Sequence, residues 1–174
     1  MFITVAAEPQ ITKVYFPREI IPFSTVFVVL VDFAVGSVLL VALIAYYKIA
    51  PTAAIAFLPV VLLVHVIFTM AVALALAMAN LFYRDVKYLF EIGAAVWMFG
   101  SSVVFPVEQI GGQLGSVLRV NPMTPIIDAY RDVLLRGELP ELVTFAAAAV
   151  VAVVALGIAW TAFHAAEGSF AENV

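Results

Sequence analysis

One long uncharged stretch limits most strongly what this chain can fold into. Residues 49–83 contain no Asp, Glu, Lys or Arg, and His65 is the only histidine among them. A helix needs roughly 20 apolar residues to cross the hydrocarbon core of a bilayer, which is about 30 Å thick. The stretch is therefore long enough to span a membrane once and to leave residues for both interfaces.

The composition agrees with a membrane protein. Of the 174 residues, 66% are hydrophobic and 11% are charged, which is more apolar surface than a soluble domain of this size can bury. The chain has no Cys, and its two His lie far apart in the sequence, so we expect neither a metal site nor another cofactor. A formal net charge of -4, with Lys and Arg scattered, argues against nucleic acid as a partner.

The apolar stretches predict an all-α, polytopic fold with about four transmembrane helices. The predicted spans are residues 20–47, 53–78, 92–107 (to which residues 88–90 can add a turn) and 142–163. Four crossings put both termini on one side of the membrane. Lys and Arg are equally frequent on the two sides, and loop length favours a cytoplasmic location for the termini and for the loop at residues 80–91.

The segment between the last two predicted spans is neither a span nor a short loop. Within it, Thr124 and Pro125 are typical of the first positions of a helix, and Gly137 is typical of its end. The apolar residues between these positions share one face of the predicted helix, namely Ile126, Ile127, Tyr130, Val133 and Leu134. The sequence therefore predicts an amphipathic helix here.

Two ionisable residues lie inside predicted spans. Asp32 is about twelve residues into the first span, or roughly 18 Å along a helix, which is near the middle of the membrane. An Asp at this depth costs about 2.5–3.5 kcal/mol on insertion scales, so its carboxyl must face protein or water, be paired, or be protonated. His65 has a similar depth in the next, antiparallel span. We predict that the two side chains interact, either as interior structure or with a direct role in transport.

Four ordered segments resemble the signature segments of a known family. They are ITKVYFPREIIP at residues 11–22, VDF at 31–33, NLFYRDV at 80–86 and NPMTP at 121–125. In this order they resemble ABC-2 type permeases, and more narrowly the exporters of O-antigen, capsule or teichoic acid chains. Family members usually carry an amphipathic helix and two further spans before the first segment. Residues 20–174 are therefore expected to be a partial ABC-2 transmembrane domain, from a truncated chain or a variant.

The resemblance implies an exporter that depends on other subunits. The chain contains no GxxxxGK[ST] phosphate-binding loop, so ATP hydrolysis would come from a separate ATP-binding cassette subunit. A second permease copy would complete a homodimer, and the substrate would be a lipid-linked polysaccharide crossing the inner, cytoplasmic membrane. Residues 1–19 would be a cytoplasmic segment that docks the ATPase. The residues expected to make this contact are Tyr15, Phe16, Pro17 and Arg18.

The resemblance also assigns roles to two corners of the permease. Asn80, Arg84 and Asp85 would form a cytoplasmic corner facing the ATPase or the entering substrate, although helix capping and headgroup contacts explain the same residues. A re-entrant element on the outer face would form a gate at the exit of the pathway, and an interfacial amphipathic helix is the alternative. The expected gate residues are Pro106, Asn121, Pro122 and Met123.

Three other functions stay open from the sequence. A proton-coupled secondary carrier would use Asp32 and His65 as its relay. An intramembrane enzyme would need a nucleophile and a base, for which Ser101 or Ser102 with His65 is the visible combination. The chain would otherwise be an inactive permease remnant that still folds.

Overall fold

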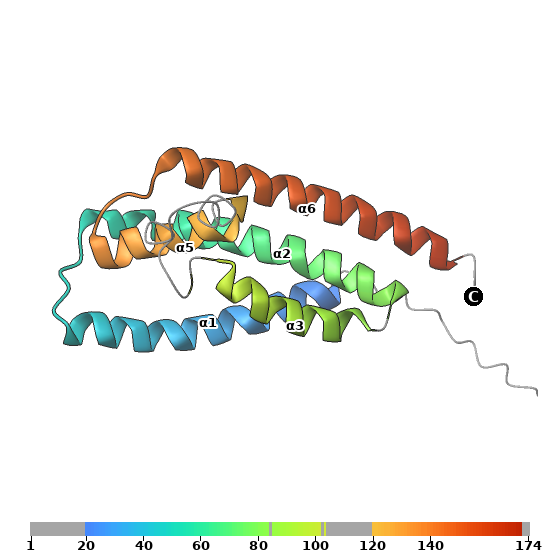
Figure 1. Cartoon of the computed structure of the whole chain (residues 1–174), viewed down its shortest axis with the longest axis horizontal. Coiled ribbons are helices and arrows are strands. Elements are labelled where there is room, and N and C mark those ends of the chain that lie inside the picture. The colour runs from blue at the N-terminus through green and yellow to red at the C-terminus, as the bar shows by residue number, and fades with distance from the viewer. Residues whose placement is uncertain (1–19, 84, 102, 104–119, 172–174) are drawn as a thin grey trace, which may run out of the picture.

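The chain folds into a bundle of helices. The computed structural model describes residues 20–83, 85–101, 103 and 120–171. Its elements are α1 (Ile20–Tyr46), η1 (Ala53–Phe57), α2 (Leu58–Phe82), α3 (Val86–Phe99), α5 (Met123–Arg131), η3 (Asp132–Arg136) and α6 (Leu142–Ala171). The long helices α1, α2 and α6 follow the long axis of the molecule, and α3 and α5 are shorter (Figure 1). The predicted all-α fold class is confirmed.

Three helices are long and apolar enough to cross a membrane within the described residues. They are Phe23–Tyr46, Ala53–Asn80 and Leu142–Ala165, close to three of the four predicted spans. The remaining predicted span, residues 92–107, is represented by α3, which begins earlier, at Val86, and has 14 residues. A helix of this length rises about 21 Å, which is less than the hydrocarbon core requires. Most of the predicted span beyond Ser101 lies outside the described residues.

The two ends of the bundle differ in what they contain. One end of the bundle, which we call the corner end, is where α2 stops, α3 begins and α6 terminates (Figure 1). At the opposite end, called the turn end, α1 closes in a left-handed cap. Lys48 has φ 54°, and the N–H of Ile49 bonds to the carbonyl of Ile44 at 3.1 Å. This pattern is a Schellman motif, and it turns the chain out of α1 toward η1.

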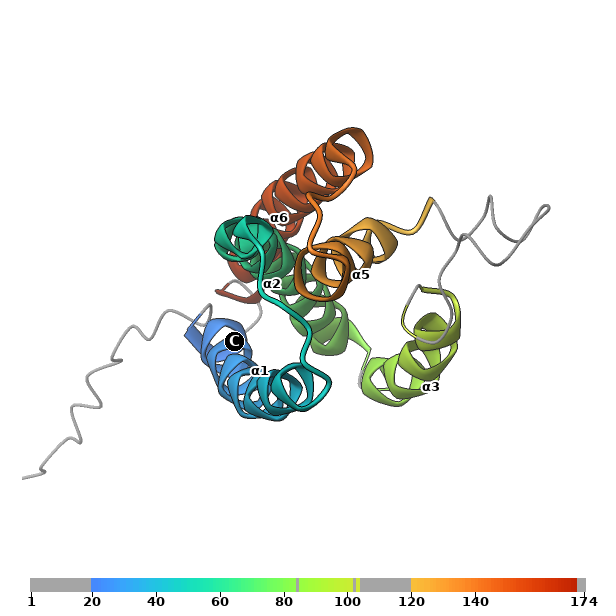
Figure 2. The same cartoon turned by 90° about the vertical axis from the view of Figure 1, so that its left-hand side faces the viewer.

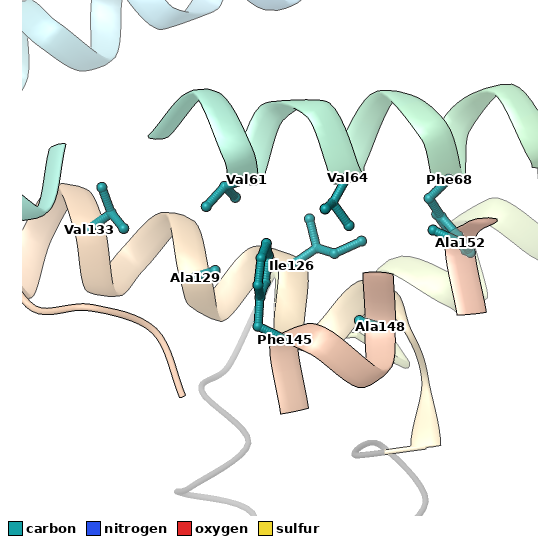
Figure 3. Close-up of a cluster of buried hydrophobic side chains, with 9 residues drawn as sticks. All are labelled: Val61, Val64, Phe68, Ile126, Ala129, Val133, Phe145, Ala148 and Ala152. Atoms are coloured by element: carbon teal, nitrogen blue, oxygen red, sulfur yellow. The ribbon is translucent and has the colours of Figure 1, made fainter. Parts of the chain in front are cut away.

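The core lies where α2, α5 and α6 meet. Viewed from the turn end, α5 fits beside the α2 and α6 pair, while α1 and α3 lie on the far side of α2 (Figure 2). The buried cluster consists of Val61, Val64, Phe68, Ile126, Ala129, Val133, Phe145, Ala148 and Ala152 (Figure 3). The α6 contribution is largely alanine, and small side chains let membrane helices approach closely where lipid removes any hydrophobic drive between them.

The predicted amphipathic helix exists as α5 with the π-helical turn η3. It starts at Met123, one residue before the predicted N-cap Thr124, because the side chain of Asn121 already accepts a hydrogen bond from the N–H of Met123 at 3.0 Å. Thr124 is buried in the first turn instead. The predicted end is confirmed, since Gly137 adopts the left-handed conformation with φ 72°.

The turn end is held by a contact between two distant segments. Thr52 caps η1 and donates a hydrogen bond from Oγ1 to the carbonyl of Gly137 at 2.9 Å. A Cβ on Gly137 would lie 2.6 Å from Cγ2 of Thr52, so this position needs glycine for space as well as for its φ. The start of the second span and the end of the re-entering helix are therefore joined at one point.

Candidate functional site

The candidate site is the junction between α3 and α5, at Asn121. Its side-chain amide donates to the carbonyl of Gly100 at 2.9 Å, which satisfies a carbonyl at the end of α3. Its side-chain oxygen accepts from the backbone N–H of Met123 at 3.0 Å and from Nε1 of Trp97 at 3.2 Å. Its backbone carbonyl accepts from the N–H of Thr124 at 3.0 Å. One asparagine thus closes the end of one helix and the start of another.

The junction lies deep in the bundle. The Trp97 ring packs edge-on against Phe68, with 6.3 Å between ring centroids, and Phe68 is near the middle of the span Ala53–Asn80. Asn121, Pro122 and Met123 were expected in a gate on a re-entrant element of the outer face, and that role stays a prediction. From these residues, α5 and η3 run from the middle of the bundle to the turn end rather than lying across it (Figure 1).

The helices α3 and α5 together cover the depth that one long helix covers elsewhere. Helix α3 runs from the corner end to the middle, and α5 with η3 continues from the middle to the turn end (Figure 1). A broken crossing leaves backbone groups without helical partners, and such backbone is tolerated at membrane depth only where protein or water surrounds it. Asn121 satisfies part of this requirement. Discontinuous helices of this kind commonly form the sites of membrane transporters.

The charges on α5 are compensated locally. Arg131 bonds to Asp128 at 3.2 Å and to the carbonyl of Val103 at 3.1 Å, which ties α5 to the chain that follows α3. Arg136 bonds to Asp132 at 2.8 Å, one turn apart on η3. Two half-buried ion pairs on a re-entering helix keep it close to neutral within the bundle.

Also near the middle of the span Ala53–Asn80, His65 contacts Tyr130 rather than Asp32. The Nδ1 of His65 lies 3.3 Å from the hydroxyl of Tyr130, and both rings pack edge-on or tilted against Phe33, with centroids 5.9 and 6.0 Å away. Asp32 is exposed on α1, and within the described residues it has no hydrogen bond or ion pair. The expected contact between Asp32 and His65 is therefore absent from the described structure, because Phe33 occupies the inward position on α1.

A groove of about 400 Å³ runs between α1, α2 and α3 next to the junction. Trp97 and Met123, which both bond to Asn121, contribute to its wall. The other lining residues are Thr25, Val26, Val29, Phe68, Thr69, Val72, Ala73, Leu76, Phe90, Ala94, Met98, Ser101 and Val103. The groove is apolar apart from a few hydroxyl groups, so it accommodates hydrocarbon better than sugar.

The cytoplasmic corner is described in part. Asn80 lies exposed in the last turn of α2, and Asp85 is the N-cap residue of α3 without a side-chain cap bond. Lys87 lies over the ring of Tyr88, with Nζ 4.6 Å from the centroid. Arg84 lies outside the described residues. The capping role considered for Asn80 is not found, because α2 continues past it to Phe82.

The serine proposed as a nucleophile has another role. The hydroxyl of Ser101 is buried and donates to the carbonyl of Met98 at 3.1 Å, while His65 contacts Tyr130. The described residues therefore do not bring Ser101 and His65 together. Ser102 and the gate residue Pro106 lie outside the described residues, as do the expected docking residues, namely Tyr15, Phe16, Pro17 and Arg18.

Sequence reasoning missed the partners of the two polar contacts. Trp97 and Tyr130 were considered only as candidates for contacting sugar in the pathway, and neither these two residues nor Gly100 was predicted as a partner of Asn121 or His65. A tryptophan in the middle of a predicted span was a usable signal, because its N–H needs an acceptor when it is away from the membrane interface. No comparable signal marks Gly100, which contributes only a backbone carbonyl.

The structure defines the class as a multi-pass helical membrane protein with a broken crossing. An O-antigen export system permease from Myxococcus xanthus is 30% identical to this chain over 166 residues, covering 94% of this chain and 64% of the relative. Two O-antigen export system permeases from Klebsiella pneumoniae are 25% and 24% identical over 140 residues each, covering 80% of this chain and 54% of each relative. No protein-family model matches the chain.

These similarities extend over most of the sequence. The similarity to these permeases supports the ABC-2 type export permease family that the sequence segments resemble. It spans between about half and two thirds of the length of these relatives.

Proposed function

We propose that this chain is the membrane-spanning permease subunit of an ATP-driven exporter in the cytoplasmic membrane. Its substrate is a polysaccharide or a lipid-linked glycan, and a separate ATP-binding cassette subunit hydrolyses the ATP. A second permease copy completes the pathway. The observation that carries the proposal is the similarity to O-antigen export permeases over 94% of the chain.

The arrangement of the polar residues supports a permease over a proton-coupled carrier. A proton relay through Asp32 and His65 requires the two side chains to meet directly or through water. His65 contacts Tyr130, while Asp32 occupies another face of α1. The relay therefore has no continuous path among the described residues.

The junction at Asn121 supports a gate inside the proposed pathway. Asn121, Pro122 and Met123 join α3, whose first residues lie at the corner where an ATPase would act, to α5, which reaches the turn end. A shift of α3 would therefore move the start of α5 through the hydrogen bonds of Asn121. The remaining expected gate residue, Pro106, lies outside the described residues.

The test is export in a cell whose own gene for this chain is deleted and replaced by an affinity-tagged copy. We expect the glycan to reach the cell surface with the tagged copy and to accumulate inside the cell without it. Substitution of the phosphate-binding Lys in the co-purifying ATPase should block export to the same extent. The tagged chain should also purify together with a differently tagged second copy.

The same cells separate the proposal from a carrier. A protonophore, added while ATP is maintained, should leave export largely unchanged. Export that stops with the protonophore and continues with the inactive ATPase would overturn the proposed function. Purification of the chain without any ATPase, from membranes that export normally, would have the same consequence.

A further inference from the structure

The two halves of α1 differ in how they meet the rest of the bundle. In the first half, Val26 is buried, and the ring of Phe23 packs against Trp160 of α6 with 5.9 Å between centroids. Phe33, near the middle of α1, packs against one ring of α2 and one of α5. Every residue of α1 after Phe33 is at least partly exposed. The second half, residues 37–46, which reaches the turn end, is therefore held less tightly than the first (Figure 1).

A cavity of about 410 Å³ separates the second half of α1 from α2, α5 and η3. Two hydroxyl groups are among its lining side chains, and both have partners, because Tyr130 contacts His65 and Ser37 bonds to its own helix. The space is therefore apolar, and in a close-packed bundle it is either filled from outside or removed by movement of its walls. The lining residues are Phe33, Gly36, Ser37, Leu40, Val41, Ile44, Leu58, Leu62, Tyr130 and Leu134.

The residues at which the second half of α1 begins are suited to bending. Gly36 and Ser37 form a pair of the kind at which long helices kink. The Oγ of Ser37 donates to the carbonyl of Phe33, one turn earlier, at 2.7 Å, and such bonds weaken and bend a helix. A Cβ on Gly36 would meet nothing within 4 Å, so neighbouring helices leave room at this point. The pair also follows directly after the last ring contact of α1 and lines the cavity.

We propose that Gly36 and Ser37 are a hinge, and that the second half of α1 swings inward about it to close the cavity. The first half stays in place, because its side chains are packed against α2, α5 and α6. The moving wall and the opposite wall are both apolar, so closure leaves no polar group unpaired. Closure would press α1 against Tyr130 and Leu134, and the positions of α1 and of the re-entering helix would then be coupled. The proposal concerns the membrane domain itself and holds whatever substrate is exported.

Distances between spin labels on α1 and α6 test the hinge in the full chain. The chain contains no Cys, so two introduced cysteines are its only attachment sites. Exposed Leu43 and Val143 report on the second half of α1, and exposed Val28 and Ile158 report on the first half. The labelled chain is mixed with an excess of unlabelled chain in lipid nanodiscs, so that distances within one chain are measured. We expect two distance populations for the first pair and one for the second. A single population for the first pair would overturn the proposal.

Two variants show whether the movement uses this hinge and this cavity. Gly36→Ala combined with Ser37→Ala should leave one population for the first pair of labels. Gly157→Ala combined with Thr161→Ala is the matched control, because it changes a glycine and a back-bonded hydroxyl on α6, and it should alter neither pair. Leu134→Trp fills the cavity from η3, without touching the hinge, and should leave only the longer distance. Two populations that persist in either the hinge variant or Leu134→Trp would overturn the proposal.

Discussion

Helices α2 and α6 are packed together along most of their length, whereas α1 buries few side chains against the same bundle. Buried side chains recur from Val61 to Leu74 on α2 and from Phe145 to Phe163 on α6. Among the described side chains of α1, from Phe23 onward, Val26 alone is buried. All three helices are apolar enough to cross a membrane, so composition does not explain the difference.

Shape explains it. In lipid, helices associate through packing and hydrogen bonds, because hydrocarbon tails are as apolar as the side chains. Ala148 and Ala152 on α6 are small enough to admit Phe68 and Ile126, whereas α1 presents mostly exposed valines and leucines. We therefore infer that α2, α5 and α6 form a unit that holds itself together, and that α1 depends on additional contacts.

The largest expected effect tests the packed unit directly. Ile126 is completely buried between α2 and α6, and Ile126→Ala should lower the free energy of unfolding by about 2–3 kcal/mol, since a cavity remains where the side chain was. The matched control is Ile158→Ala on the exposed side of α6, with 64% exposure, which should change stability by less than about 0.5 kcal/mol. Thermal unfolding in detergent measures both. Equal losses would mean that α5 is not part of the core.

The packed unit was also the more predictable region. Uncharged stretches place α2 and α6 within a few residues, as they do α1 outside the unit, and the turn residues around α5 predict its end at Gly137. The break in the middle of the third crossing was not predictable in this way. Residues 92–107 are as apolar as a span, so composition predicts a continuous helix there. The hydrogen bond from Asn121 to the carbonyl of Gly100, 21 positions earlier, cannot be predicted from a local sequence pattern.

The expected pairing of Asp32 with His65 failed for a related reason. Matched depth along two helices was the sole basis of that prediction, and depth does not specify the direction in which a side chain points. Phe33, one position away, takes the inward direction and packs against His65. The depth estimate itself agrees with the structure, because this contact brings the level of Asp32 close to that of His65.

The second largest effect is expected at the junction between α3 and α5, which differs from α2 and α6 in being a broken crossing. Asn121→Ala removes the side-chain hydrogen bonds to Gly100, Trp97 and Met123. A typical hydrogen bond contributes about 0.5–1.5 kcal/mol, so with partial compensation the free energy of unfolding should fall by about 1–3 kcal/mol. If the junction transmits movement, export should fall more than the amount of folded protein does. The matched control is Thr161→Ala, at an exposed position of α6 whose hydroxyl bonds to carbonyls of its own helix, and it should leave both export and the amount of folded protein unchanged. Wild-type export from a folded Asn121→Ala protein would remove the junction from the proposed gate.

A loss of similar size is expected at the turn end, where η3 is joined to the start of the second span. Gly137→Ala forces a side chain into a left-handed conformation and against Thr52, at a cost of about 1–3 kcal/mol. Gly157→Ala is the matched control, because it lies inside α6 with nothing within 4 Å and should stabilise the helix by up to about 1 kcal/mol. Thermal unfolding of the two variants should therefore shift in opposite directions. A loss of the same size in Gly157→Ala would contradict the special role of Gly137.

The smallest effect concerns the contact through which α1 meets the packed unit. Tyr130→Phe keeps the ring against Phe33 and removes one hydroxyl, so it should cost about 0.5–1.5 kcal/mol, the contribution of a single hydrogen bond to His65. Tyr46→Phe, at a 79% exposed position, is the control and should have no effect.

A double-mutant cycle in detergent then decides which partner His65 has. His65→Ala should lose its additivity when combined with Tyr130→Phe and should be additive with Asp32→Asn, because only groups in contact share an interaction energy. The opposite result would show that His65 interacts with Asp32 rather than with Tyr130. Helix α1 would then be tied to α2 by its own carboxyl, and the contrast between a self-sufficient unit and a dependent helix would lose its basis.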